Sequence, residues 1–240
     1  MPLLLWINSG GLFESVVQQS LQSISPRMLS ETDLRTFFKN AANQKVVDFL
    51  LVDEGNNIFI DAKGVAMSWI GMVTHLPGTV RSQSKSSILK GIEQAYALAE
   101  RLSKETYIGD VLLGSKNNYL LIVTFKDLYV SDGKNFRDLI APDEIDKIIA
   151  SHGNQKWIPL SNIQIISIDD LDILVGCVKK SGKSISSILE YAVKSDQIPD
   201  QMKFVFRQHV FEICPEVDML PALQTSLDML MQKLREKIND

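Results

Sequence analysis

The apolar positions of this 240-residue chain repeat with two periods, one typical of helices and one typical of buried strands. Apolar residues recur every three or four positions near 12–24 and again over 86–102, which predicts two amphipathic helices. Between them, residues 46–51 and 58–60 are rich in β-branched and aromatic types, the composition of buried strands. Residues 53–57 carry turn chemistry between these two runs. We therefore predict helix, β-hairpin, helix.

Three further segments of the first half complete this pattern. Residues 119–125 are almost entirely apolar and predict a buried strand, and 128–130 are expected to pair with it through Lys126-Asp127. Residues 33–38 fit either a short helix or an entering strand. Gly, Pro and Ser in 71–87 predict a long connection, where a substrate-facing loop would lie.

The second half carries weaker signals. Pro142 and the acids after it predict the start of a helix, and 163–168 alternate like a strand. Asp169 and Asp170 then fit the N-terminal cap of a helix better than a metal site. The leucines spaced by three and four over 220–234 predict either a coiled-coil seam between two copies or the packing face of a terminal helix.

These elements predict an α/β fold. We expect a core over residues 1–135 and an α/β extension over 136–240, packed on the core and ending in an amphipathic helix. A chain of this length with 45% hydrophobic residues can bury a core of that size.

Two acids and a lysine stand inside the predicted hairpin strands. Asp48 interrupts one apolar run, and Asp61 and Lys63 close the other. A charge in such a run costs several kcal/mol of folding free energy unless it is paired, so a charged residue there usually has a functional role. A two-residue turn at Glu54-Gly55 puts Asp48 opposite Asp61, and a four-residue turn puts it opposite Lys63. Either even-length turn brings the three side chains onto one face, where they would form a hard-cation site suited to Mg²⁺ or Mn²⁺.

This ordered set resembles the PD-(D/E)xK, or restriction-endonuclease-like, nuclease superfamily. Asp48, a hairpin and Asp61-Ala62-Lys63 match its central motif, Glu14 lies in the first predicted helix, and Gln94 lies in the helix after the motif. RecB-like members carry a tyrosine four residues after the glutamine, whereas Tyr96 lies only two after Gln94. Residues two apart face different sides of a helix, so Tyr96 is not expected in the site.

The resemblance implies a restriction-endonuclease-like core, in which helices flank a mixed central sheet, and metal-dependent hydrolysis of phosphodiester bonds. Asp48, Asp61 and the Ala62 carbonyl would hold Mg²⁺ or Mn²⁺, and Lys63 would orient or deprotonate the attacking water. Glu14 would hold metal-bound water or Lys63, and Gln94 would support the site. It also implies an endonuclease acting on DNA in host defence against phage. Two alternatives stay open, a catalytically silent nucleic-acid-binding or assembly module and a nuclease acting on RNA.

Charge and composition bear on the partners. The net charge of −4 does not favour a protein that coats nucleic acid, but two local basic clusters could contact phosphate. The expected nucleic-acid contacts are Arg81, Lys85, Lys90, Lys179, Lys180 and Lys183. Their alternative role is that of solvated surface charge. No apolar stretch reaches membrane-spanning length, and the two cysteines lack metal-ligand spacing, so a cytoplasmic protein is expected. A homodimer and an activating protein partner are left open.

Residues 176–184 and the pair Asp61 and Lys63 each allow another interpretation. Residues 176–184 look like a phosphate-binding P-loop, but five residues separate Gly176 from Gly-Lys-Ser where the motif requires four. We therefore do not expect an NTPase. Asp61 and Lys63 could also form a plain structural ion pair on an exposed sheet face, with Asp48 as an edge residue.

Overall fold

The computed structural model describes residues 10–25, 27–38, 45–64 and 77–217, without the side chains of residue 10 and of 77–84. One five-stranded sheet runs through the described part, in the order β1-β2-β3-β6-β7. The first three strands are antiparallel, and β3, β6 and β7 are parallel to one another. The strands are β1 (Leu29–Ser30), β2 (Phe49–Asp53), β3 (Asn56–Lys63), β6 (Asn118–Thr124) and β7 (Ile163–Ser167). A separate ribbon is formed by β4 (Tyr107–Ile108) and β5 (Val111–Leu112).

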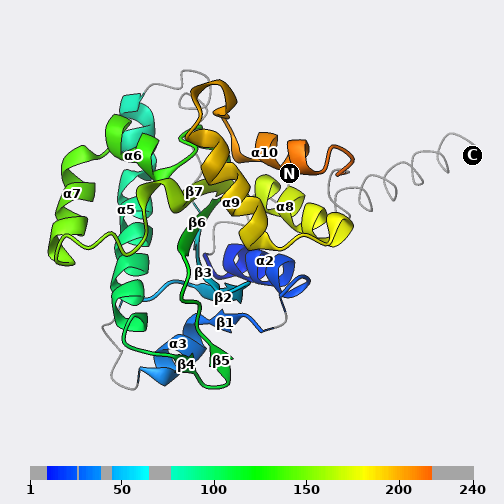
Figure 1. Ribbon diagram of the computed structural model, residues 1–240. Helices are drawn as coiled ribbons and strands as arrows, with labels where there is room; N and C mark the ends of the chain where they lie inside the picture. Colours follow the sequence, from blue (N-terminus) through cyan, green and yellow to red (C-terminus); the bar gives the residue numbers. More distant parts are fainter. Residues whose placement is uncertain (1–9, 26, 39–44, 65–76, 218–240) are drawn as a thin grey trace, which may run out of the picture.

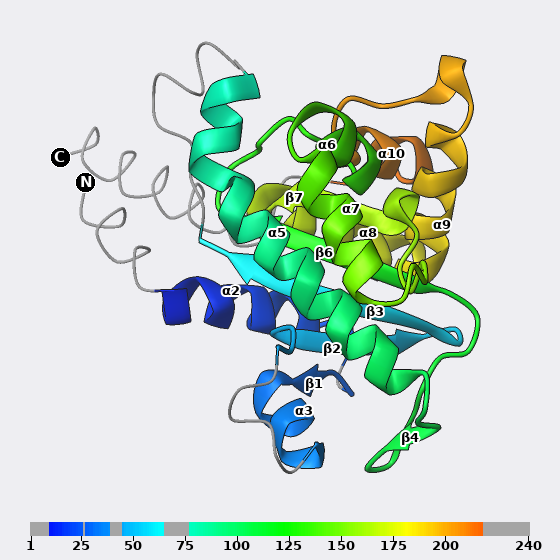
Figure 2. The ribbon, with the colours of Figure 1, turned by 90° about the vertical axis from the view of Figure 1, so that its left-hand side faces the viewer.

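Helices cover both faces of the sheet, which makes a three-layer α/β arrangement (Figures 1 and 2). The first face, which carries Phe59 and Ile122, packs against α3 (Glu31–Phe37), α5 (Pro77–Leu102), α6 (Gly133–Leu139) and α7 (Pro142–Ser151). The second face, which carries Ile60 and Leu121, packs against α2 (Gly10–Gln22), α8 (Ile168–Ser181), α9 (Ile185–Asp196) and α10 (Phe206–Ile213). Two 3-10 turns, η1 (Leu160–Asn162) and η2 (Pro199–Gln201), complete the described chain.

The hairpin β2–β3 has the tighter of the two turns that the sequence allowed. Asp53 pairs with Asn56, so Glu54 and Gly55 are the two turn residues. Both have positive φ, +49° and +80°, as the favoured two-residue hairpin turn requires. The strand register is therefore the one that places Asp48 opposite Asp61.

Several expectations hold for the helices. The helices at 12–24 and 86–102 are present as α2 and α5, and the ambiguous segment 33–38 falls mostly in α3. Ser167 caps α8 in a capping box with Asp170, in agreement with a capping role at this point. The P-loop-like stretch is no phosphate loop, because Gly176 lies inside α8 and Gly182 caps its end in the left-handed conformation.

Two expectations were wrong. Residues 128–130 do not pair with β6; Tyr129 has a φ of +54°, which breaks an extended strand, and the chain continues to a single antiparallel bridge between Asp132 and Gln164. The connection expected over 71–87 is helical from Pro77, where α5 begins, and residues 71–76 lie outside the described residues. The proline fits there because a helix leaves its first N–H groups without an intrahelical acceptor.

Residue 135 is not a boundary of the sheet. The strand expected at 163–168 is β7, and it pairs with β6 through five residues. Residues after 135 thus supply a strand of the central sheet and three helices of one face. The leucine stripe over 220–234 lies outside the described residues.

Candidate metal centre

Strand register builds a row of acids at one end of the sheet. Ser30 pairs with Phe49, and Phe49 pairs with Ile60. One step further along each strand lie Glu31, Asp48 and Asp61, so that these three acids stand side by side across neighbouring strands. Asp61 and Lys63 lie on the first face of the sheet, under α5, because side chains alternate along β3.

Asp61 is completely buried, with 0% of its surface exposed. Lys63 Nζ lies 2.6 Å from Asp61 Oδ2, and this ion pair offsets the buried charge. Among the described residues, no donor makes a hydrogen bond of good geometry to either oxygen of Asp61. Burial outweighs the attraction of Lys63 and raises the pKa of Asp61 to about 7, to which the nearby carboxylate of Asp48 contributes. A buried carboxylate with unused lone pairs is a ready ligand for a cation.

Helix α5 fixes the position of Lys63. The Lys63 ammonium donates a hydrogen bond of 3.2 Å to Gln94 Oε1, and Gln94 Nε2 donates one to the Val46 carbonyl. Gln94 is buried and therefore held on both sides. Gln94 thus contacts Lys63, whereas Tyr96 is fully buried and its hydroxyl donates to the Ile158 carbonyl.

Gly91 lets α5 approach this closely. A Cβ added at Gly91 would overlap Asp61 Oδ2 and lie 3.4 Å from Lys63 Cε. The sequence analysis missed this residue. Its signal was a glycine in the middle of an amphipathic helix, which costs stability unless close packing requires it.

Glu14 and Asp48 lie together at the end of the sheet. Asp48 Oδ2 accepts a hydrogen bond of 2.7 Å from the Ala62 N–H, which ties the start of β2 to the end of β3. Glu14 reaches Asp48 from α2, which covers the second face of the sheet. Burial raises the pKa of both carboxyl groups. The charges of Asp48 and Glu31 add to the effect on the pKa of Glu14, and the charge of Glu31 adds to the effect on the pKa of Asp48. The contact between Ala62 and Asp48 is made by the amide of Ala62, whereas the expected metal ligand is its carbonyl.

Glu31 is the second residue that the sequence analysis missed. Glu14, Glu31 and Asp48 each bring one carboxylate oxygen to within 4.8 Å of the others. Glu31 is the first residue of α3, which Ser30 and Asp33 hold in a capping box. Arg35, one turn later, pairs with Glu31 at 2.6 Å. The sequence signal for Glu31 was weak, because an acid in the first turn of a helix usually does no more than stabilise that helix.

The expected nucleic-acid contacts fall in different places. Lys90 is exposed and precedes Gly91, so it lies beside the acids, and its charge acts on Asp48 and Asp61. Lys85 is paired with Glu144 of α7. Arg81 lies in the first turns of α5, and its side chain is outside the described residues.

The basic cluster at Lys179, Lys180 and Lys183 lies toward the other end of the sheet. Helix α8 starts at the carboxyl end of β7 and runs back for 14 residues, about 21 Å. The next helix begins against the hairpin turn, where the Ser186 N–H donates to Asp53 Oδ2 at 2.7 Å. Lys180 contacts Glu216. The fold therefore separates this cluster from the acids.

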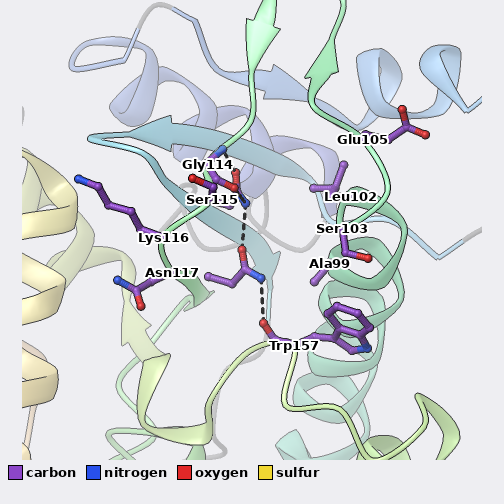
Figure 3. Close-up of a pocket in the computed structure, with 11 residues that line it drawn as sticks. Ala99, Leu102, Ser103, Glu105, Gly114, Ser115, Lys116, Asn117 and Trp157 are labelled. Carbon is purple, nitrogen blue, oxygen red and sulfur yellow. Dashed lines mark hydrogen bonds between the residues drawn. The ribbon is translucent and has the colours of Figure 1, made fainter.

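An open pocket of about 320 Å³ also lies far from the acids, at the hairpin-turn end of β3 (Figure 3). Its amide side chains are used within the protein. Asn57 Nδ2 donates to Asn118 Oδ1 and to the Gly114 carbonyl, and Asn118 Nδ2 donates to the Trp157 carbonyl. These bonds fasten the 114–118 segment to the sheet, which is a structural role.

Comparison of the chain with models of protein families, with curated proteins and with solved structures gave no match. In the described part of the chain, the helices are too short or too polar to cross a membrane.

Proposed function

We propose that this protein is a Mg²⁺-dependent nuclease, most simply an endonuclease acting on DNA, with a core like that of the restriction endonucleases. One observation carries the proposal: the two-residue turn sets Asp48 opposite Asp61 and leaves Asp61 and Lys63 together under α5. Glu14 and Gln94, which the resemblance places at such a site, both reach it. The order of elements, helix, antiparallel hairpin, helix and parallel strand, supports the same assignment.

The donor set fits a hard divalent cation. Asp61 offers two buried oxygens, and Lys63 Nζ lies 2.6 Å from one of them. Asp48 is the acid opposite Asp61, and Glu14 brings a further carboxylate to Asp48. All-oxygen donors suit Mg²⁺ or Mn²⁺ rather than zinc. When bound, the ion would polarise the scissile phosphate and make a neighbouring water more acidic.

The side chains around the metal would orient the attacking water and contact the substrate. Asp61 and Gln94 hold the Lys63 ammonium from two sides, so it can orient a water and stabilise negative charge that develops on the phosphate. Preorganisation of this kind spares the cost of ordering the lysine during the reaction. The exposed Lys90, one turn before Gln94, can contact a neighbouring phosphate of the nucleic acid.

One observation favours a second candidate. Asp61 is inaccessible and its ion pair with Lys63 is complete, an arrangement that also suits a silent nuclease-like module that binds nucleic acid.

Cleavage of supercoiled plasmid with Mg²⁺ or Mn²⁺ separates the two candidates. The nuclease produces nicked or linear DNA that EDTA and the Asp61→Ala substitution both abolish. Intact plasmid from the wild type, followed by intact RNA in the same assay, would leave the binding module as the assignment. Cleavage of RNA but not of DNA would change the proposed substrate to RNA and leave the proposed metal-dependent hydrolysis unchanged.

A further inference from the structure

We propose that Glu31, from α3, is a further ligand of the metal and that Arg35 positions it. The inference rests on the proposed function, because it concerns the ion of the same site. The resemblance does not reach Glu31, which follows β1 and lies outside the matching motif.

Geometry places Glu31 among the other ligands. It stands one step beyond the last pair of β1 and β2, opposite Asp48, and its carboxylate lies within 4.8 Å of those of Asp48 and Glu14. In an octahedral site with bonds of about 2.1 Å, neighbouring oxygens are about 3.0 Å apart and opposite ones about 4.2 Å. Side-chain rotations that draw the three carboxylates closer together would therefore complete the set.

The state of Asp61 is a second observation that favours a cation here. Asp61 belongs to the same row and is fully buried; Lys63 pairs with its Oδ2, and no described residue makes a hydrogen bond of good geometry to Oδ1. Carboxylates that are buried side by side cost free energy unless positive charge balances them. A divalent ion removes both the repulsion and the unused lone pairs.

Charge also fits a single divalent ion. The row and Glu14 supply four carboxylates, and within the described part of the chain the cations paired with them are Lys63 on Asp61 and Arg35 on Glu31. Two negative charges remain when all groups are ionised, which one Mg²⁺ or Mn²⁺ balances. The more distant, exposed Lys90 adds a weaker positive potential.

Arg35 keeps Glu31 in place. Its Nε and Nη2 both donate to Glu31 Oε1, at 2.8 and 2.6 Å. The pair is four residues apart on α3, and the capping box sets where this helix begins. The position of the carboxylate is therefore fixed by a helix start, a fork of hydrogen bonds and a strand register. Through Glu31, the ion would tie α3 to the β2–β3 hairpin.

The test is calorimetric titration of Mn²⁺ into the full chain without nucleic acid, for wild type, Glu31→Gln and Glu105→Gln. Glu105 is an exposed acid at the other end of the molecule, so its substitution removes the same charge without touching the site. We expect Glu31→Gln to weaken Mn²⁺ binding at least about 10-fold and Glu105→Gln to change it less than about twofold. The rise in Tm on adding Mn²⁺ should shrink in Glu31→Gln alone.

The outcomes distinguish the two proposals. If the wild type binds Mn²⁺ and Glu31→Gln binds it as strongly as Glu105→Gln does, the role of Glu31 is overturned and the metal site is kept. A wild type that binds no Mn²⁺ would overturn the metal site and the role of Glu31 together. Circular dichroism of metal-free Glu31→Gln, with the wild-type spectrum expected, shows that loss of binding is not loss of the fold.

Discussion

The energetics of the site depend mainly on Asp61. Its carboxylate is buried beneath α5, its partner Lys63 is one strand repeat away, and a second acid, Asp48, is directly across the hairpin. Burial of an unneutralised charge costs several kcal/mol, and removal of one partner of such a pair usually costs more than the pair contributes. The metal-free protein therefore stores an unfavourable charge that binding of a cation would relieve.

This charge should make the stability of the metal-free protein depend on pH. The pKa of Asp61 is about 7 in the folded chain against an ordinary value of 3.8, so between these values the folded state holds a proton that the unfolded state has lost. The free energy of unfolding should then fall as pH rises from about 4 to 7. Urea unfolding in EDTA at pH 5 and pH 8 measures the difference, which Asp61→Asn should make smaller. The same pH dependence in both proteins would contradict the assigned pKa.

At the scale of elements, the site depends on how closely α5 approaches β3. Gln94 and Lys63 meet because Gly91 removes a side chain between the helix and Asp61. The hairpin supplies the other half, since its two-residue turn sets the register of the acids.

We predict that Gly91→Ala destabilises the protein by about 1–2 kcal/mol. Alanine normally stabilises a helix interior by about 0.5–1 kcal/mol relative to glycine, but here its methyl group would overlap Asp61 Oδ2. Chemical denaturation measures the change. Gly11→Ala is the matched control, because a Cβ at this helical glycine meets no atom of the described residues within 4 Å. Equal stability of Gly91→Ala and the wild type would show that α5 is not held against Asp61.

The elements also show what the sequence could predict. The hairpin and its acids were readable because period-two alternation and turn residues are local signals, and one even-length turn fixes which side chains share a face. Glu31 was not readable, since its place opposite Asp48 depends on a two-residue strand, β1, that has almost no pattern of its own. Residues 128–130 have the composition of a strand, but their apolar side chains serve burial without strand pairing: Leu128 and Val130 pack in the core while Tyr129 turns the backbone.

At the scale of the whole molecule, the second half of the chain completes the first. Strand β7 covers the edge of β6, and α8, α9 and α10 bury Leu121 and Val123 on the second face. Ser186 and Asp53 join α9 to the hairpin turn through two hydrogen bonds. The sheet that carries the acids is therefore built from both halves, although the acids come from the first.

A chain ended after residue 135 should accordingly fail to unfold cooperatively. It would expose the β6 edge and the apolar residues that the three later helices cover, and an open, apolar edge strand promotes aggregation. Thermal unfolding followed by circular dichroism, alongside a chain ended after Val217, measures the difference. A sharp transition for residues 1–135 would contradict the account and support an independent core.

The measurement that tests the central claim most directly is the rate of plasmid cleavage by Lys63→Ala and Lys90→Ala, with Mn²⁺ affinity measured on the same preparations. Both substitutions remove one lysine near the acids, but only Lys63 is held between Asp61 and Gln94. We expect Lys63→Ala to bind the metal and lose at least about 100-fold in rate, and Lys90→Ala to keep most of its rate. Equal cleavage by Lys63→Ala and the wild type would contradict a nuclease centred on this lysine.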